Sequence, residues 1–181
     1  MPTNQIQLIR DRIRDVPDFP KPGILFKDIT PLLADPLAFH AATEALAAPY
    51  HGTHIDLVVG IEARGFIFGT AVAGLLDVGF VPIRKPGKLP WETRSVSYEL
   101  EYGSDALEIH ADAVAEGQRV LVVDDLLATG GTAVAPTELL RKAGARVDRA
   151  AFVIDLPDLG GNARLASQSL DVRALMAFDG D

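Results

Sequence analysis

The sequence of 181 residues contains no cysteine, which excludes a disulfide scaffold and any metal site built on thiolates. His40, His51 and His54 do not have the spacing of metal ligands, so we assign them no role and predict no metal centre made by the protein alone. No apolar run approaches the roughly 18 residues that a membrane-spanning helix needs. Residues 1–15 also lack the apolar core of a secretory signal. We therefore expect a single cytoplasmic domain over residues 1–181.

The net charge of −8 argues against binding to nucleic acid through the overall field of the protein. Salt screens charges beyond about 8 Å, so a local basic cluster decides whether an anionic substrate can bind. The one tight cluster is Arg84-Lys85-Pro-Gly-Lys88. A charge run of this kind is by default a solvated loop. Its position directly after the apolar strand expected at 79–83 favours a role in anion binding instead.

The stretch 119–133 reads Arg-Val-Leu-Val-Val-Asp-Asp-Leu-Leu-Ala-Thr-Gly-Gly-Thr-Ala. Its apolar residues 120–123 precede Asp124 and Asp125, and a loop of small residues then leads into an alanine-rich segment. This order predicts a buried strand, a tight loop and the start of a helix. Backbone N–H groups at a helix N-terminus favour an anion, and ionised carboxylates accept hydrogen bonds from sugar hydroxyls. The stretch therefore indicates a binding site for a sugar phosphate.

An ordinary strand–loop–helix unit offers a simpler explanation, with Thr129 or Thr132 acting only as the helix N-cap. The loop matches neither the Gly-Lys-Ser/Thr nor the G-x-G-x-x-G phosphate motif. The paired aspartates nevertheless favour a site. Pro136 limits where the helix begins, because proline is tolerated only within the first turn. We expect the helix to start at Thr132 or Ala133.

Strands and helices alternate along most of the chain, which predicts an α/β fold with a mainly parallel sheet flanked by helices. A flexible β-hairpin outside the core is expected at 96–109, with its turn at 103–105. Other strands are expected at 55–60, 79–83, 119–123, 146–156 and 171–178, and helices within 1–14 and at 36–46, 66–76, 110–116, 133–143 and 162–168.

Residues 16–31 carry three prolines within six positions, which exclude a helix there. Such a loop could close over a flat ligand, with backbone amides binding its edge. A surface loop held to the core by Phe19 and Phe26 fits the composition equally well.

The motif at 120–133 closely resembles the phosphoribosyl pyrophosphate (PRPP) signature of type I phosphoribosyltransferases, in the form found in adenine-specific members. Three other segments match that family in order. Asp-Phe-Pro-x-Pro-Gly-Ile-x-Phe-Lys-Asp-Ile-Thr-Pro at 18–31 is similar to its adenine-binding hood, 61–65 to its pyrophosphate loop, and 84–88 to its basic flap. The resemblance implies the type I phosphoribosyltransferase fold, with a small hood formed by 16–31 and 156–161 and a flexible β-hairpin loop.

The resemblance also implies purine salvage, in which adenine and PRPP give AMP and diphosphate, in a homodimer. The ribose and 5′-phosphate would be bound by Asp124, Asp125, Ala128, Thr129, Gly130, Gly131 and Thr132. The diphosphate would be bound by Glu62, Ala63, Arg64, Gly65, Arg84, Lys85 and Lys88. Adenine would be bordered by Leu25, Phe26, Lys27 and Leu156.

Glu101, beside Tyr102 on the flap, would exchange a proton with the purine ring, although a solvent-facing strand glutamate fits the local pattern too. Arg64 could instead pair with Glu62 on the surface, and Lys88 reaches across a dimer interface in that family. Mg²⁺ prefers oxygen ligands and keeps several waters, so we expect it to be bound through PRPP or diphosphate.

The sequence leaves two alternatives. A phosphoribosyltransferase for hypoxanthine, guanine, xanthine or orotate would share the sugar-phosphate loop but not the hood. A PRPP-sensing transcription regulator on the same fold would need a DNA-binding extension, and both the short segment before Asp18 and the net charge argue against it.

Overall fold

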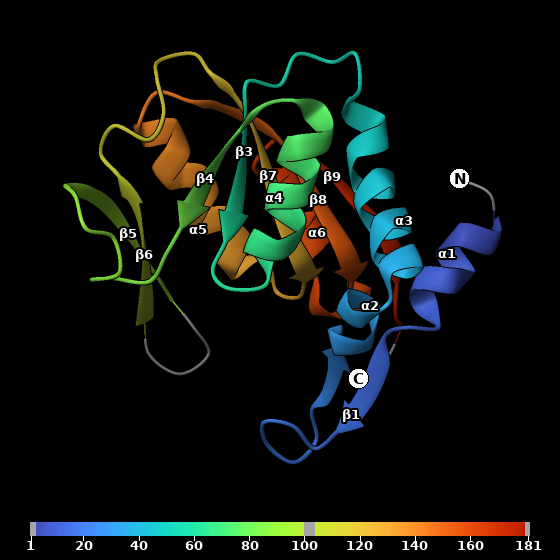
Figure 1. Ribbon diagram of the computed structural model, residues 1–181. Coiled ribbons are helices and arrows are strands. Elements are labelled where there is room, and N and C mark those ends of the chain that lie inside the picture. Colours follow the sequence, from blue (N-terminus) through green and yellow to red (C-terminus); the bar gives the residue numbers. More distant parts are fainter. Residues whose placement is uncertain (1–2, 100–103, 180–181) are drawn as a thin grey trace.

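The computed structural model describes residues 3–99 and 104–179, and Figure 1 shows how its elements are arranged. Five parallel strands form the central sheet, in the spatial order β4-β3-β7-β8-β9. Val59 lies opposite Val81 on one side and Val122 on the other. The strands are β3 (Leu57–Ile61), β4 (Gly79–Ile83), β7 (Arg119–Leu127), β8 (Arg146–Asp155) and β9 (Asp171–Ala177). The predicted α/β class with a mainly parallel sheet is confirmed.

Successive residues of a strand point to opposite sides of the sheet, so the continuous apolar runs of the central strands make both faces apolar. Helices cover both faces and bury them. Leu121 and Val123 of β7 pack in one apolar cluster with Phe68 of α4. Val120 and Leu139 belong to the second cluster, on the α5 face. The helices are α1 (Thr3–Arg10), α2 (Thr30–Ala34), α3 (Pro36–Ala47), α4 (Gly65–Leu76), α5 (Gly131–Lys142) and α6 (Gly161–Ser167), with short 3₁₀ turns η1 (Ala48–Tyr50) and η2 (Pro157–Leu159). Among the described residues, no helix has the length and apolar character needed to span a membrane.

The proline-rich segment is not the irregular loop that its composition predicts. Strands β1 (Arg14–Pro17) and β2 (Leu25–Asp28) pair in an antiparallel hairpin, which we call the hood. The prolines lie at the end of β1 and in the connection, where they cost no ladder hydrogen bond, and 25–28 is free to pair. In Figure 1 the hood lies beyond the carboxyl ends of the central strands. It therefore stands where ligands of open α/β sheets bind.

The second hairpin, β5 (Thr93–Glu99) and β6 (Ser104–His110), forms at the predicted place. Its expected position outside the core is wrong, because Leu107 and Ile109 are fully buried in the α5-side cluster. Strand β6 also joins the end of β4 through paired backbone hydrogen bonds between Arg84 and Glu108. The hairpin is therefore attached to the main body beside the basic cluster.

Two helix predictions need correction. No helix forms over 110–116, where His110 ends β6 and turns lead into β7. The Ala111 N–H donates to the Glu92 carbonyl oxygen at 2.8 Å and so continues the hairpin pairing, and the Ala113 N–H donates to the His110 carbonyl oxygen at 3.1 Å in a turn. Helix α5 begins at Gly131, one residue earlier than expected, so Pro136 is its sixth residue and lies beyond the first turn. Gly130, at φ +78°, provides the left-handed N-cap that allows this earlier start.

Candidate active site

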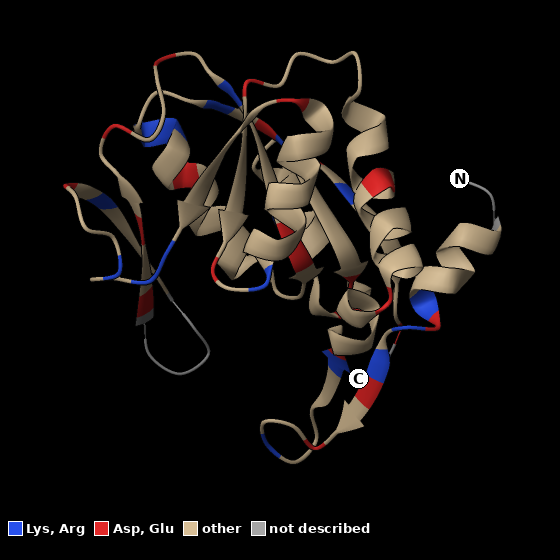
Figure 2. Ribbon diagram, in the orientation of Figure 1, with Lys and Arg blue, Asp and Glu red and all other residues tan. Residues whose placement is uncertain are grey.

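A cavity of about 260 Å³ lies at the carboxyl ends of β3 and β7. It brings together the predicted ribose-phosphate residues and the first predicted diphosphate segment, which are some sixty positions apart in sequence. Figure 2 shows charged positions gathered along the same edge of the sheet. The cavity is lined by Ile61, Glu62, Ala63, Arg64, Asp124, Asp125, Leu126, Ala128, Thr129 and Thr132.

The two aspartates lie within β7, since the strand continues to Leu127 and not only to Val123 as expected. Asp124 is 9% exposed and Asp125 is 4% exposed. Burial raises the pKa of both carboxyl groups, and the charge of Asp125 raises that of Asp124 further. The Asp125 N–H donates to Asp124 Oδ1 at 2.9 Å. Keeping these buried carboxylates charged without a ligand costs free energy. Hydrogen bonds donated by the hydroxyl groups of a ligand would offset that cost, which is what a binding site for a sugar needs.

Arg64 does not join the predicted diphosphate cluster, and it does not pair with Glu62 either. Its Nε lies 3.0 Å from Asp125 Oδ2, and its guanidinium carbon lies 5.1 Å from the centroid of the Phe26 ring. The ion contact is not aligned as a hydrogen bond, so Asp125 Oδ2 keeps lone pairs for a ligand. Arg64 therefore connects the predicted ribose-binding carboxylates with the hood.

Gly65 begins α4 at a point of close approach to β7. A Cβ atom here would lie 2.8 Å from Asp124 Oδ1 and 3.0 Å from the Val123 carbonyl oxygen. Only glycine therefore lets the loop of residues 62–65 lie against the aspartates. The predicted binding of diphosphate by the backbone amides of Glu62, Ala63, Arg64 and Gly65 stays a prediction.

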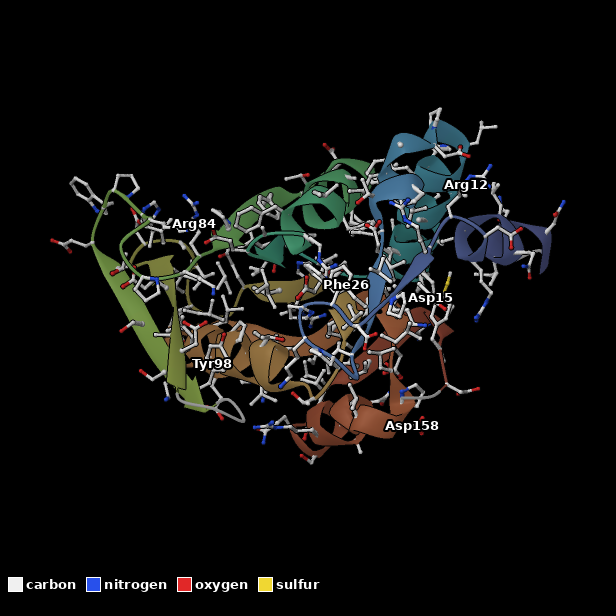
Figure 3. The ribbon with its side chains drawn as sticks, turned by 90° about the horizontal axis from the view of Figure 1, so that it is seen from below. Arg12, Asp15, Phe26, Arg84, Tyr98 and Asp158 are labelled. Atoms are coloured by element: carbon white, nitrogen blue, oxygen red, sulfur yellow. The ribbon has the colours of Figure 1, made fainter. Side chains whose placement is uncertain are left out.

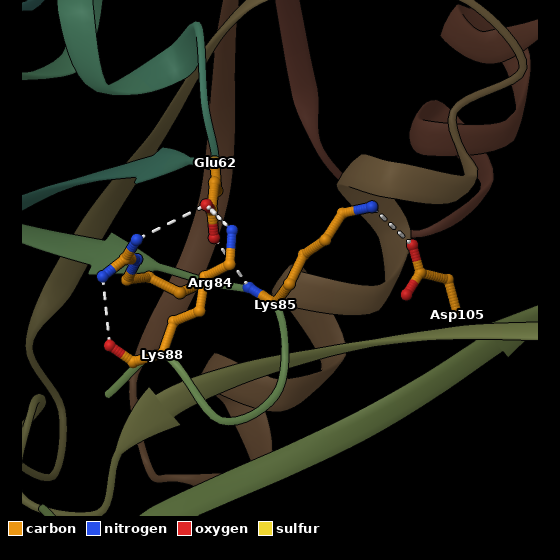
Figure 4. A network of polar contacts seen from close by, with 5 residues as sticks. All are labelled: Glu62, Arg84, Lys85, Lys88 and Asp105. Atoms are coloured by element: carbon orange, nitrogen blue, oxygen red, sulfur yellow. Dashed lines mark hydrogen bonds and ion pairs between the residues drawn. The ribbon is translucent and has the colours of Figure 1, made fainter. Parts of the chain in front are cut away.

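Glu62 acts through its side chain, a role that sequence reasoning missed. Lys88 Nζ lies 2.6 Å and Arg84 Nη2 lies 3.4 Å from Glu62 Oε1, and the Lys85 backbone N–H donates to Oε2 at 2.9 Å (Figure 4). Burial raises the pKa of this carboxyl, but the hydrogen bonds and charges of the basic cluster outweigh burial and lower it to about 2. The cations thus converge on an ionised group that lines the cavity.

The remaining cation of the cluster, the Lys85 ammonium, points to the second hairpin. Its Nζ lies 3.2 Å from Asp105 Oδ2 on β6 (Figure 4). The Gly87 N–H donates to Glu108 Oε2 at 3.1 Å. Carboxylates in the loop after β3 and on β6 therefore hold the basic loop 84–88 beside the cavity before any ligand binds.

The small-residue loop 128–131 packs directly on the start of α6. A Cβ on Gly161 would collide with the Ala128 carbonyl oxygen and lie 3.0 Å from the Gly130 nitrogen. Reciprocally, a Cβ on Gly130 would lie 3.2 Å from Gly161 Cα. Sequence reasoning missed Gly161, although the Gly160-Gly161 pair after β8 was a signal of close backbone approach.

The predicted adenine residues divide between the two faces of the hood. Phe26, which Figure 3 labels on the hood, faces Arg64. Its ring meets that of Phe19 edge to face, with the ring centroids 5.1 Å apart. An open hollow of about 200 Å³ is lined by Val16, Phe19, Phe26 and Asp28. The rings of Phe19 and Phe26 give this hollow an apolar wall against which a planar ligand could lie.

Lys27 does not present its side chain to that surface. Its Nζ lies 2.8 Å from Asp15 Oδ1 and 4.7 Å from the Phe178 ring centroid, and the side chain is 4% exposed. Neighbouring residues of a strand alternate, so Lys27 points away from Phe26 and only its backbone can border a ligand there. Leu25 and Leu156 are half-buried and border neither hollow.

Glu101 and Tyr102 lie outside the described residues, so their predicted roles on the flap are untested. Within 3–99 and 104–179, no group of three or more His, Cys, Asp or Glu side chains is arranged to hold a metal ion. The expected binding of Mg²⁺ through PRPP stays a prediction.

A parallel sheet that carries paired carboxylates, a glycine loop and a basic cluster at its carboxyl edge is the arrangement of a phosphoribosyl-transferring protein. Residues 31–170 match the family model described as "Phosphoribosyl transferase domain", and the chain belongs to this family. Its relatives include the adenine phosphoribosyltransferases of Bradyrhizobium sp. (strain ORS 278), 60% identical over 172 residues with 95% of this chain and 96% of the relative covered, and of Methylobacterium nodulans, 57% identical with 99% of both covered.

Solved structures give the same assignment. Adenine phosphoribosyltransferase from Thermoanaerobacter pseudethanolicus superposes with a TM-score of 0.92 at 53% identity, covering 96% of this chain and 99% of that one. The Saccharomyces cerevisiae enzyme, complexed with adenine and D-2,5-dideoxy-2,5-imino-altritol 1,6-bisphosphate, has a TM-score of 0.89 at 40% identity over 96% of this chain and 99% of that one. The type I phosphoribosyltransferase fold expected from the motifs is confirmed.

Proposed function

We propose that this protein is a purine salvage enzyme that transfers the 5-phosphoribosyl group of PRPP to adenine, giving AMP and diphosphate. The observation that carries this proposal is the cavity at the ends of β3 and β7, where buried carboxylates, a glycine loop and a glutamate-bound basic cluster meet. The relatives' shared activity and the adenine in the yeast complex support the choice of base.

The chemistry of the transfer matches these groups. As diphosphate leaves C1′, positive charge builds on the ribose and negative charge on the leaving group. Arg84, Lys85 and Lys88 stabilise the departing oxyanions, and each preorganised donor of this kind is worth a few kcal/mol, on the order of 3. Arg84 and Lys88 must exchange Glu62, and the Lys85 ammonium must exchange Asp105, for phosphate oxygens. Because these carboxylates already hold the three cations beside the cavity, little reorganisation is needed when PRPP binds.

Residues on the other side of the cavity position the substrates. Asp124 and Asp125 accept hydrogen bonds from the ribose hydroxyls and hold the ring in line with the attacking nitrogen of adenine. Residues 128–132 bind the 5′-phosphate at the N-terminus of α5. Glu101 exchanges the purine proton in this proposal. Phe26 supplies the apolar wall for the base, and Arg64 stands between the base and ribose sites.

Mg²⁺ enters this proposal as a companion of PRPP, where it supplies positive charge to the diphosphate. The buried Asp125 Oδ2, which accepts no hydrogen bond from the described residues, suits an ion that prefers one or two carboxylates and several waters. A homodimer with Lys88 near the partner and a cytoplasmic location belong to the same proposal. Sedimentation of the purified protein tests the dimer.

The deciding experiment measures conversion of radiolabelled adenine with PRPP and Mg²⁺, in parallel with hypoxanthine, guanine and xanthine. We expect AMP as the dominant product and far slower reaction of the other bases. A clear preference for another base would overturn the assignment of adenine. Absence of any PRPP-dependent product would overturn the enzymatic proposal itself. No observation in the structure favours a transcription regulator, and nucleic acid is not among the proposed partners.

A further inference from the structure

Phe178, just after β9, contacts the end of β8 and the hood, the two segments that the family resemblance implies on either side of adenine. Its backbone N–H donates to the carbonyl oxygen of Asp155 at 3.0 Å, and Asp155 directly precedes Leu156. Lys27 Nζ lies 4.7 Å from the centroid of the Phe178 ring, and Lys27 directly follows Phe26. One residue thus joins the strand end that carries Leu156 to the hood strand that carries Phe26.

The contact with Lys27 is well placed to fix the hood. The Lys27 side chain is 4% exposed, so its ammonium has lost most of its hydration and depends on its protein partners. These partners are Asp15, which belongs to the hood itself, and the Phe178 ring, which does not. A desolvated cation over an aromatic face is among the stronger contacts of this kind. The Phe178 ring is therefore the partner of Lys27 that connects the hood to the main body of the protein.

A second cation contacts the same ring without belonging to the hood. The Arg10 guanidinium carbon lies 4.5 Å from the Phe178 centroid, and Arg10 Nη2 donates to the Ala177 carbonyl oxygen at 2.8 Å. Arg10 lies at the end of α1. Arg10 contacts the ring without reaching the hood, so it provides a matched control for the loss of a cation over the same ring.

We propose that Phe178 is a positioning residue that sets the separation between the hood and the end of β8, and so the width of the slot that receives the base. The proposal rests on the function proposed above. Phe178 itself does not touch the base, because it contacts Lys27 on the face of β2 opposite to Phe26. Its effect on base binding passes through the backbone of β2 and through Asp155.

The width of such a slot matters because a planar ring binds by contact on both faces. Carbon atoms attract best at about 3.5–4.0 Å, and a gap wider by about 0.5–1 Å already forfeits a quarter to a half of that attraction. Loosening the hood should therefore weaken adenine binding. The ribose-phosphate and diphosphate groups, held at the ends of β3, β4 and β7, should be unaffected.

The test compares Phe178→Leu, Phe178→Tyr and Arg10→Gln with the wild type in steady-state assays that vary adenine and PRPP separately. Loss of the aromatic ring in Phe178→Leu should raise the KM for adenine about three- to tenfold. The KM for PRPP and kcat should stay within about twofold, because no transition-state contact is lost. Phe178→Tyr keeps the ring and should restore the adenine KM. Arg10→Gln should leave it unchanged.

Lys27→Met provides a second approach, since it removes the ammonium but keeps most of the side-chain volume. It should raise the adenine KM in the same selective way, and the double variant with Phe178→Leu should add little, because both changes break one contact. Equal increases in both KM values, or an unchanged adenine KM in active Phe178→Leu and Lys27→Met proteins, would overturn the inference alone. A wild type that does not use adenine would overturn the proposed function, and this inference with it.

Discussion

Glu62 and Lys88 are 26 positions apart in the sequence, yet Lys88 Nζ lies 2.6 Å from Glu62 Oε1. This contact joins the loop after β3 to the loop after β4, which are neighbours in the sheet. A carboxylate at the centre of a cluster of cations is held ionised by them, and it in turn keeps them from repelling one another. We therefore expect Glu62 to hold the cations of the proposed diphosphate site in place.

The acid stability of the protein should depend on Glu62. The pKa of this carboxyl is lowered on folding from 4.5 to about 2, so its contribution to the free energy of unfolding is present above pH 4.5 and is lost as the pH falls toward 2. Glu62→Gln removes that dependence. Urea unfolding of both proteins between about pH 5 and 3.5 should give a shallower pH slope for the variant. Identical slopes would show that Glu62 keeps an ordinary pKa in the folded state.

Lys88 should contribute to PRPP binding and not to adenine binding. Lys88→Gln removes a cation next to the leaving diphosphate, and we expect an increase of about tenfold or more in the KM for PRPP. The KM for adenine should not change. Lys142→Gln, at the end of α5, removes an equal charge from an exposed position and serves as the control for net charge. Equal effects of the two variants would indicate a long-range field and not a contact.

The sequence could predict the sheet because buried parallel strands and their helices leave strong apolar patterns, as in residues 120–123. The sequence could also predict where the candidate site lies, since loops at the carboxyl ends of neighbouring parallel strands lie at the same edge of the sheet. It could not predict that Arg64 pairs with Asp125 or that the Glu62 side chain holds Lys88. Those partners depend on side-chain directions and distances that one-dimensional spacing does not contain.

The errors have equally local causes. Composition indicated a loop over the hood because three prolines count against a strand, but their positions at the end of β1 and in the connection left β2 intact. The face occupied by Lys27 follows from strand alternation, which becomes visible only once β2 is known to be a strand. Burial of Leu107 and Ile109 was missed because their strand resembles any amphipathic hairpin until α5 is seen to cover it.

Asp125 should be required for activity but not for stability. Burial raises the pKa of its carboxyl on folding, so the charged group lowers stability at any pH above its unfolded pKa. Asp125→Asn removes this cost, and Arg64, whose side chain is 35% exposed, can regain water. We expect an unchanged or higher melting temperature together with a loss of about 10- to 100-fold in kcat/KM for PRPP. Full activity of Asp125→Asn would contradict its role on the ribose hydroxyls.

Gly161 should control the geometry of the phosphate loop although it does not line the cavity. In Gly161→Ala the added methyl group meets the Ala128 carbonyl oxygen, and since backbone cannot rotate aside as a side chain can, the loop must move. We expect an increase of about five- to tenfold in the KM for PRPP and a destabilisation of about 1–3 kcal/mol. Gly74→Ala, within α4, has open space around its Cβ and should be neutral or slightly stabilising. If Gly161→Ala keeps the wild-type KM for PRPP, the packing of α6 on the loop is not what positions the phosphate.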